Sequence, residues 1–125
     1  MATVLVLDDV VENASLAADY LRQCGHDVFE AHTGREALSL VTFAQFDVLV
    51  IDLHLPDMNG VDLIGTLRRD PDPRVARVPI IAATAFAMAS DRERCLDAGA
   101  NDYLPRPFRL KDLNERVCQL LNSPA

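Results

Sequence analysis

The sequence predicts an α/β fold built on a doubly wound parallel sheet, and three observations lead to this class. Strand-like and helix-like segments alternate five times along the 125 residues. Three of the strand-like segments are nearly unbroken apolar runs, which is typical of parallel strands covered by helices on both faces. Capping patterns mark the helices between them. Right-handed crossovers then give a (βα)5 sheet, and we expect residues 1–125 to form one domain.

The five predicted strands differ in how apolar they are. Residues 3–7 (TVLVL), 47–51 (DVLVI) and 78–83 (VPIIAA) are the apolar runs. Residues 27–31 (DVFEA) carry two charges, which favours an edge strand because charge discourages pairing with other chains. Residues 101–104 form the fifth predicted strand and have the weakest pattern.

Helix boundaries are predicted from local signals. Thr33 and Ser90 are each followed three residues later by glutamate, so helices should begin just after them. Gly25 and Gly99 stand where a helix-ending left-handed residue is needed. The proline- and charge-rich residues 70–77 predict a surface loop before the fourth strand. In the last helix five apolar residues at helical spacing predict one buried face. They are Leu110, Leu113, Val117, Leu120 and Leu121.

Composition limits the classes of function and of cellular location. Twelve basic against nineteen acidic residues give a charge of −7, which argues against nucleic-acid binding through phosphate neutralisation. No apolar run is long enough to cross a bilayer and no leader precedes the first strand, so we expect a cytoplasmic protein without membrane contact. The cysteines form no CxxC motif and are interpreted as reduced thiols that act as small buried hydrophobes. They are Cys24, Cys95 and Cys118.

Polar residues stand where four of the predicted strands end. Asp8 and Asp9 follow the first strand and Asp52 follows the third. Thr84 follows the fourth, and the fifth runs into Arg106. Ligands of open parallel sheets bind outside these carboxyl ends. If the first and third strands are neighbours, three carboxylates meet there, and charges about 4 Å apart repel by about 4 kcal/mol at an effective dielectric of about 20.

A bound cation would relieve this repulsion, and Mg²⁺ prefers a few hard oxygen ligands that are open to water. The alternative is that Asp8 and Asp9 are solvated carboxylates that begin a helix. Asp52 favours the metal site, because ionisable groups at the end of a buried strand are disproportionately functional.

Four segments together resemble the receiver domain of two-component response regulators, in particular the single-domain regulators of the chemotaxis type. They are the Asp8-Asp9 pair, DVLVIDLHLPDMNG, AATAFAM and DYLPRPF, and the resemblance covers essentially the whole chain. It implies a flavodoxin-like sheet with strand order 2-1-3-4-5, which is the order of chemotaxis receivers. It also implies a switch that is phosphorylated and dephosphorylates itself, rather than a turnover enzyme.

The resemblance implies a role for each residue at the strand ends. Asp52 would take a phosphoryl group from a histidine kinase or a histidine phosphotransfer protein. Asp9, Asp52 and the backbone carbonyl of His54 would hold Mg²⁺. Asp8 would act mainly through water bound to that ion. Thr84 would hydrogen-bond the phosphoryl oxygens.

Output is expected through partner proteins. The resemblance implies a binding face formed by the fourth helix, the fifth strand and the fifth helix, without direct nucleic-acid contact. Only residues 122–125 follow the predicted last helix, so we expect a switch without its own output domain, whether the chain is a whole protein or part of a longer one. Tyr103 would be the switch that turns inward when Thr84 moves toward the phosphate; the alternative is an ordinary core aromatic residue.

Arg106 departs from the family, which has a lysine here, followed by a proline whose peptide bond is usually cis. Pro105 and Pro107 hold Arg106 toward the acidic crevice. Its guanidinium is planar and suited to bidentate contact, unlike a lysine ammonium. We favour a contact between Arg106 and the phosphoryl group, which keeps the switch working. Alternatively, Arg106 pairs with Asp52 at rest and blunts phosphorylation, which would leave a module that binds proteins without being phosphorylated.

Three histidines and one phenylalanine near the strand ends carry weaker predictions. The ring of His54 is interpreted as a rim residue rather than a metal ligand. His26 and His32 flank the edge strand and are expected at the surface. Phe86 is a candidate for shaping access to the phosphate.

Other phosphate-handling folds fit the sequence less well. A flavodoxin binds its flavin phosphate in the first loop, but here residues 8–12 are acidic, lack glycine and would repel a phosphate. A haloacid-dehalogenase-type phosphatase needs a second acid two residues after its nucleophile, and that position is His54. No GxxxxGK pattern of a P-loop occurs.

Overall fold

The structure, a computed structural model, describes residues 2–84 and 89–122. Five parallel strands lie in the order β2-β1-β3-β4-β5, which confirms the predicted fold class and strand order. The strands are β1 (Thr3–Leu7), β2 (Asp27–Ala31), β3 (Val48–Ile51), β4 (Ile80–Thr84) and β5 (Asp102–Pro105). The helices are α1 (Val11–Gln23), α2 (Gly34–Phe43), α3 (Gly60–Arg68), α4 (Pro73–Ala76), α5 (Ala89–Ala98) and α6 (Leu110–Asn122).

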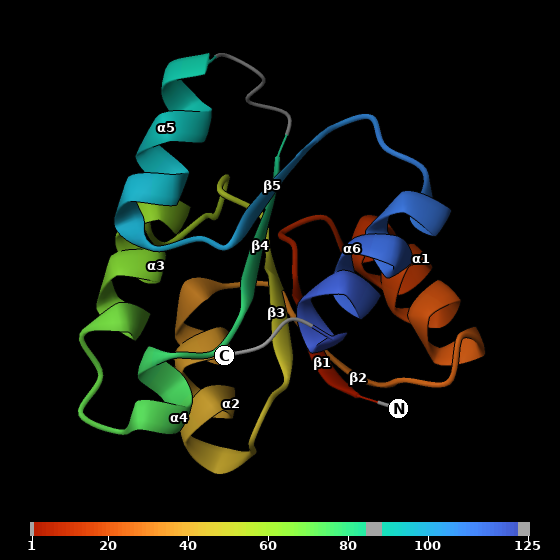
Figure 1. The fold of residues 1–125 in the computed structure, drawn as a ribbon, viewed down its shortest axis with the longest axis horizontal. Coiled ribbons are helices and arrows are strands. Elements are labelled where there is room, and N and C mark those ends of the chain that lie inside the picture. Colours follow the sequence, from red (N-terminus) through yellow and green to blue (C-terminus); the bar gives the residue numbers. More distant parts are fainter. Residues whose placement is uncertain (1, 85–88, 123–125) are drawn as a thin grey trace.

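Helices cover both faces of the sheet (Figure 1), with α1 and α6 on one face and the other helices on the opposite face. Each face has its own apolar core. Leu5 and Leu49 point into the core beneath α2 and α3. Val4 and Val48 point into the core beneath α1 and α6. Because β1 and β3 are covered on both faces, their side chains must be apolar at every position, which explains the unbroken runs.

The boundaries of three strands differ from the prediction by one or two residues. The predicted fourth strand included Val78 and Pro79, but Pro79 has no N–H to donate and contributes only its carbonyl, which accepts from Leu49 at 2.9 Å. Asp47 lies outside β3, and its carboxylate accepts from the N–H of Thr3 at 2.8 Å. β5 likewise begins one residue later than predicted and extends to Pro105.

The two predicted capping boxes have different outcomes. Thr33 caps α2 as predicted, since its hydroxyl oxygen accepts from the N–H of Glu36 at 3.1 Å. The prediction for α5 was wrong: the helix begins at Ala89, so Ser90 lies inside its first turn. Alanine favours helix, and Ala89 therefore adds to the start of the helix at low cost.

The predicted loop of residues 70–77 contains the short helix α4. The carboxylate of Asp72 accepts from the N–H of Arg74 at 2.9 Å, and Pro73 suits the first helical position because its φ is fixed. In α6, Leu113 and Val117 are buried, but Leu121 is 37% exposed. Eight residues rotate a side chain by roughly 80° around the helix, which turns Leu121 away from the sheet.

Glycine and cysteine predictions are confirmed in part. Gly25 and Gly99 have positive φ angles of 98° and 122°, as predicted for residues that end helices. All three cysteines are free. Cys95 is buried as predicted, Cys118 is partly buried, and Cys24 is exposed just after α1, so the prediction of burial was wrong for Cys24. Within the described part of the chain, no helix combines the length and apolar character needed to span a membrane.

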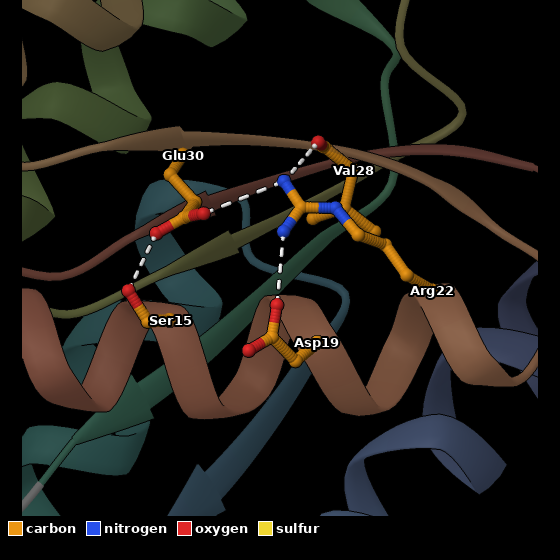
Figure 2. Close-up of polar contacts among 5 residues, drawn as sticks. All are labelled: Ser15, Asp19, Arg22, Val28 and Glu30. Atoms are coloured by element: carbon orange, nitrogen blue, oxygen red, sulfur yellow. Dashed lines mark hydrogen bonds and ion pairs between the residues drawn. The ribbon is translucent and has the colours of Figure 1, made fainter.

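A polar cluster ties α1 to the edge strand β2 (Figure 2). Arg22 donates to the main-chain carbonyl of Val28 at 2.8 Å and to Glu30 at 3.4 Å, and it pairs with Asp19 at 3.1 Å. The hydroxyl of Ser15 donates to Glu30 at 3.1 Å. The Val28 carbonyl faces the open side of β2, whose only neighbour is β1. Arg22 therefore covers a strand group that could otherwise pair with another chain.

Replacing Arg22 by methionine should lower the free energy of unfolding by about 1 kcal/mol, because it removes the charged donor of the Val28 carbonyl while keeping an apolar stem of similar length. Urea unfolding measures the change. Arg74→Met is the matched control, since Arg74 forms only an exposed ion pair with Asp72, and it should cost less than about 0.5 kcal/mol. Equal losses in the two variants would contradict the importance of the edge contact.

Candidate phosphoacceptor and metal site

Neighbouring strands bring Asp8, Asp9 and Asp52 together. The register of β1 and β3 pairs Leu7 with Ile51, so the residues that follow both strands lie at the same edge of the sheet. The N–H of Asp52 donates to the carbonyl of Leu7 at 2.9 Å, which fixes that alignment. One oxygen atom of each carboxylate lies within 4.8 Å of the other two. The structure thus groups the acidic residues that the sequence singled out.

The site is partly buried, and its charges perturb one another. Asp8 is 1% exposed and Asp52 is 6% exposed, whereas Asp9 is exposed. Burial raises the pKa of Asp52 to about 6, and the nearby charges of Asp8 and Asp9 act in the same direction. The main-chain N–H of His54, which donates to Asp52 at 3.0 Å, and the charge of Arg106 oppose this rise. Ionised Asp52 is therefore a carboxylate that gains from a nearby cation.

The donor set fits Mg²⁺, because it offers hard carboxylate oxygens, one of them on an exposed residue open to water. Asp8 has the least free capacity: one oxygen accepts from the N–H of Val10 at 2.9 Å and the other pairs with Arg106. Asp9 and Asp52 are the better candidates for direct ligands. The ring of His54 is exposed and lies outside this acidic group. The ligand role of its carbonyl stays a prediction.

Arg106 lies against the acidic cluster. Its Nη2 atom donates to Asp8 Oδ2 at 2.5 Å, and its side chain is 25% exposed. Among the described residues, the structure records no ion pair between Arg106 and Asp52, so the resting partner is Asp8. The guanidinium carbon also lies 5.7 Å from the centre of the Phe108 ring. Its Nε is buried and has no hydrogen-bond partner in the described part of the chain. Arg106 thus has one N–H that none of the described residues accepts.

Thr84 ends β4, whereas Tyr103 lies inside the neighbouring strand β5, opposite Ala82. Thr84 is fully buried at the end of β4, and its carbonyl accepts from the N–H of Arg106 at 2.7 Å. Tyr103 is 8% exposed and packs in the core beneath α5, where burial raises its pKa. The peptide bond before Pro107 is cis, as the resemblance implied. Phe86 lies outside the described residues. The switch role of Thr84 and Tyr103 stays a prediction.

Two histidines that were expected at the surface are partly or fully buried. His32 is half-buried, and its Nδ1 lies 3.0 Å from the main-chain carbonyl of Asp8. A carbonyl only accepts, so Nδ1 of His32 donates this bond. His26 is 8% exposed, with Nε2 at 3.0 Å from the side chain of Asn114. The two contacts span 24 and 88 positions of sequence, and no local pattern signals them.

The fold and this acidic cluster agree with a comparison of sequences. Residues 4–118 match the model of the response regulator receiver domain, and the chain therefore belongs to this family. Receiver domains are signalling switches. The chain is also similar to the crystal structure of the receiver domain of sensor histidine kinase PA1611 from Pseudomonas aeruginosa PAO1, with a TM-score of 0.88, 32% identity and 98% of each chain covered. That structure has a magnesium ion coordinated in its active-site cleft.

Two whole regulators are similar in sequence. The transcriptional regulatory protein CpxR of Escherichia coli K12 is 36% identical over 121 residues, which are 97% of this chain and 50% of CpxR. The DNA-binding dual master transcriptional regulator RpaA of Synechocystis is 34% identical over 121 residues, 97% of this chain and 49% of RpaA. The chain spans about half the length of these relatives. Its expected lack of direct nucleic-acid contact stays a prediction.

Asp52→Asn should stabilise the metal-free protein at pH 8. The folded-state pKa of about 6 lies above the ordinary 3.8, so ionising Asp52 weakens folding as the pH rises through this window. Asparagine carries no charge, and we expect a gain of about 2 kcal/mol above pH 7 that shrinks as the pH falls below 6. Urea unfolding in chelator measures it.

Asp57→Asn provides a control of opposite sign. The N–H of Gly34 lowers the pKa of Asp57 by hydrogen bonding, so Asp57 stabilises the fold in its charged form. This variant should lose stability at pH 8 and approach the parent protein in acid. A gain for Asp52→Asn that does not change with pH would contradict the proposed cost of burying its charge.

Proposed function

We propose that this chain is a phosphoacceptor switch in a two-component or phosphorelay pathway, with residues 1–125 forming the receiver. Asp52 takes a phosphoryl group from the phosphohistidine of a kinase or a phosphotransfer protein in a magnesium-dependent reaction. The observation that carries the proposal is the cluster of Asp8, Asp9 and Asp52 within 4.8 Å, with the guanidinium of Arg106 beside it. Carboxylates with only a structural role would not need to lie so close together, because their like charges repel.

Asp52 has the properties that a phosphoryl acceptor needs. With a pKa of about 6 it is largely ionised at neutral pH, and it is more basic than an ordinary carboxylate. Its attack forms an oxygen–phosphorus bond while the nitrogen–phosphorus bond of phosphohistidine breaks, and the leaving imidazole takes a proton from water. Its oxygen that faces His54 stays held by the main-chain N–H, which orients the carboxylate.

Positive charge and hydrogen-bond donors supply most of the remaining catalysis in phosphoryl transfer. Mg²⁺, held by Asp9, Asp52 and the carbonyl of His54, would neutralise the phosphoryl oxygens. Arg106 supplies the second cation, and its buried Nε has a donor to spare. Thr84 supplies a hydroxyl from the end of β4. We infer that the phosphoryl group draws Thr84 and thereby biases Tyr103, which packs beneath α5.

The output surface follows from this coupling. Because α4 is a short additional helix, the expected partner face corresponds to α5, β5 and α6 of this structure. Exposed charges of both signs occupy it, among them Arg92, Glu93 and Lys111. A protein partner that senses the packing of Tyr103 beneath this face would read the phosphorylation state.

Acetyl phosphate with Mg²⁺ tests the acceptor. Intact mass spectrometry should show the addition of one phosphoryl group to the protein, and Asp52→Asn should abolish it because no carboxylate remains to attack. Chelating the metal should slow the reaction strongly. If the protein binds Mg²⁺ but gains no phosphoryl group, the result would instead favour the alternative, a module that signals by protein contact alone.

Arg106 variants test the second cation. Arg106→Lys should keep or raise the rate of phosphorylation by acetyl phosphate, since an ammonium can also neutralise the phosphoryl oxygens. Arg106→Met should lower the rate by about 100-fold, the usual effect of removing one charge-stabilising group. A sharp loss in Arg106→Lys would show that the planar guanidinium itself is needed, and equal rates in all three proteins would remove Arg106 from the mechanism.

A further inference from the structure

The loop of residues 53–59, which follows Asp52, carries the His54 main chain into the site. Its two ends are held by contacts within the loop and its flanks. The N–H of His54 donates to Asp52 at 3.0 Å, and the N–H of Gly60 donates to the carbonyl of Leu53 at 3.0 Å. His54 and Asn59 also form an isolated bridge across the loop. These contacts close the loop on itself, and at its start Asp52 is joined to β1 because its N–H donates to the carbonyl of Leu7.

Asp57, in the middle of this loop, attaches it to α2. One carboxylate oxygen accepts from the N–H of Gly34 at 2.9 Å and the other from the N–H of Arg35 at 3.0 Å. Two bonds from a single carboxylate fix its orientation as well as its distance. Met58 lies directly against the same turn, because a Cβ atom added to Gly34 would lie 2.4 Å from the Met58 sulfur. The loop and the first turn of α2 are therefore in close contact.

This attachment differs from an ordinary helix cap. α2 already has a local cap, since Thr33 accepts from the N–H of Glu36 at 3.1 Å. Asp57 reaches the same helix from 22 and 23 positions away in the sequence. By contrast, Asp72 caps α4 from the residue just before that helix. The contact of Asp57 thus connects two separate parts of the chain and does more than begin a helix.

On its other side, the start of α2 is attached to the first strand end. His32 donates to the main-chain carbonyl of Asp8 at 3.0 Å, and the N–H of Asp8 donates to the carbonyl of Ala31 at 3.0 Å. The four residues from His32 to Arg35 therefore contact both the Asp8 main chain and the loop that follows Asp52. They follow β2, on the side of β1 away from β3, and join the two halves of the acidic site through these contacts.

We propose that Asp57 and His32 are positioning residues that set the spacing between Asp8–Asp9 and the His54 main chain through the first turn of α2. The inference rests on the proposed function of this site, because the spacing matters only if both halves hold one ion. Mg²⁺ requires nearly ideal octahedral geometry, so a small displacement of one half weakens binding. Residues that orient ligands without touching the ion commonly change metal affinity by tenfold or more.

The experiment uses the full chain and two readouts. In metal-free protein, hydrogen exchange of the His54 N–H reports whether the loop is held. A titration with MgCl₂, followed by the backbone amide signals of Asp52 and His54, gives the dissociation constant. Asp57→Ala should speed exchange at His54 and weaken magnesium binding by about tenfold. Asp57→Asn keeps one acceptor oxygen and should restore part of both losses.

Matched controls separate positioning from stability. Asp72→Ala removes a carboxylate cap from α4, which precedes the amino end of β4, far from the strand ends that carry the acidic cluster. This variant should leave both readouts within about twofold of the parent. His32→Leu should weaken magnesium binding, whereas His26→Leu, at the other end of β2, should not. If Asp57→Ala and Asp72→Ala change the two readouts equally, the proposal is overturned.

The outcome for the parent protein separates this inference from the proposed function. If the parent protein binds no magnesium, the proposed function fails; if Asp57→Ala nevertheless speeds exchange at His54, the attachment is real but holds no metal ligand. If the parent binds magnesium and Asp57→Ala binds it equally well, the positioning role fails alone.

Discussion

The repulsion among three carboxylates at the end of β1 and β3 is the constraint on which the rest of the site depends. Asp8 and Asp52 are almost fully buried, and main-chain bonds between the strands hold them near Asp9. The fold therefore keeps unfavourable charge in one place, and the raised pKa of Asp52 measures part of that cost. One cation of the chain itself, Arg106, reduces it without removing it. A site arranged in this way gains from further positive charge.

At the end of the sheet opposite the carboxylates, a single arginine bonds several loops together. There Arg68 donates to the carbonyls of Gly99, Ala76 and Val78 at 2.9, 3.0 and 2.7 Å. It also donates to the side chain of Asn101 at 2.8 Å. Burial lowers the pKa of Arg68, which is consistent with a cation held by neutral acceptors. Arg68 thus joins the segments that precede β4 and β5.

The sequence was sufficient for the sheet and for the identity of the residues at its carboxyl edge, because apolar runs and strand-end polar groups are local signals. It did not predict the partner of Arg106, the contact of His32 with the Asp8 carbonyl or the attachment of Asp57 to α2. Each of these depends on the direction of a side chain across 98, 24 or 23 positions of sequence. The short helix α4 was missed for another reason: the proline- and charge-rich composition of residues 70–77 was interpreted as a surface loop.

Arginine at position 106 changes what the second cation can do if a phosphoryl group forms on Asp52 as proposed. An ammonium is one compact charge whose three donors sit on a single atom. A guanidinium has several donors in one plane: here Nη2 contacts Asp8 while Nε, buried, has no partner among the described residues. Arg106 could therefore keep Asp8 and still donate to a phosphoryl oxygen. Under the proposed function, Arg106 then needs no exchange of partners on phosphorylation, and Thr84 is the group expected to move.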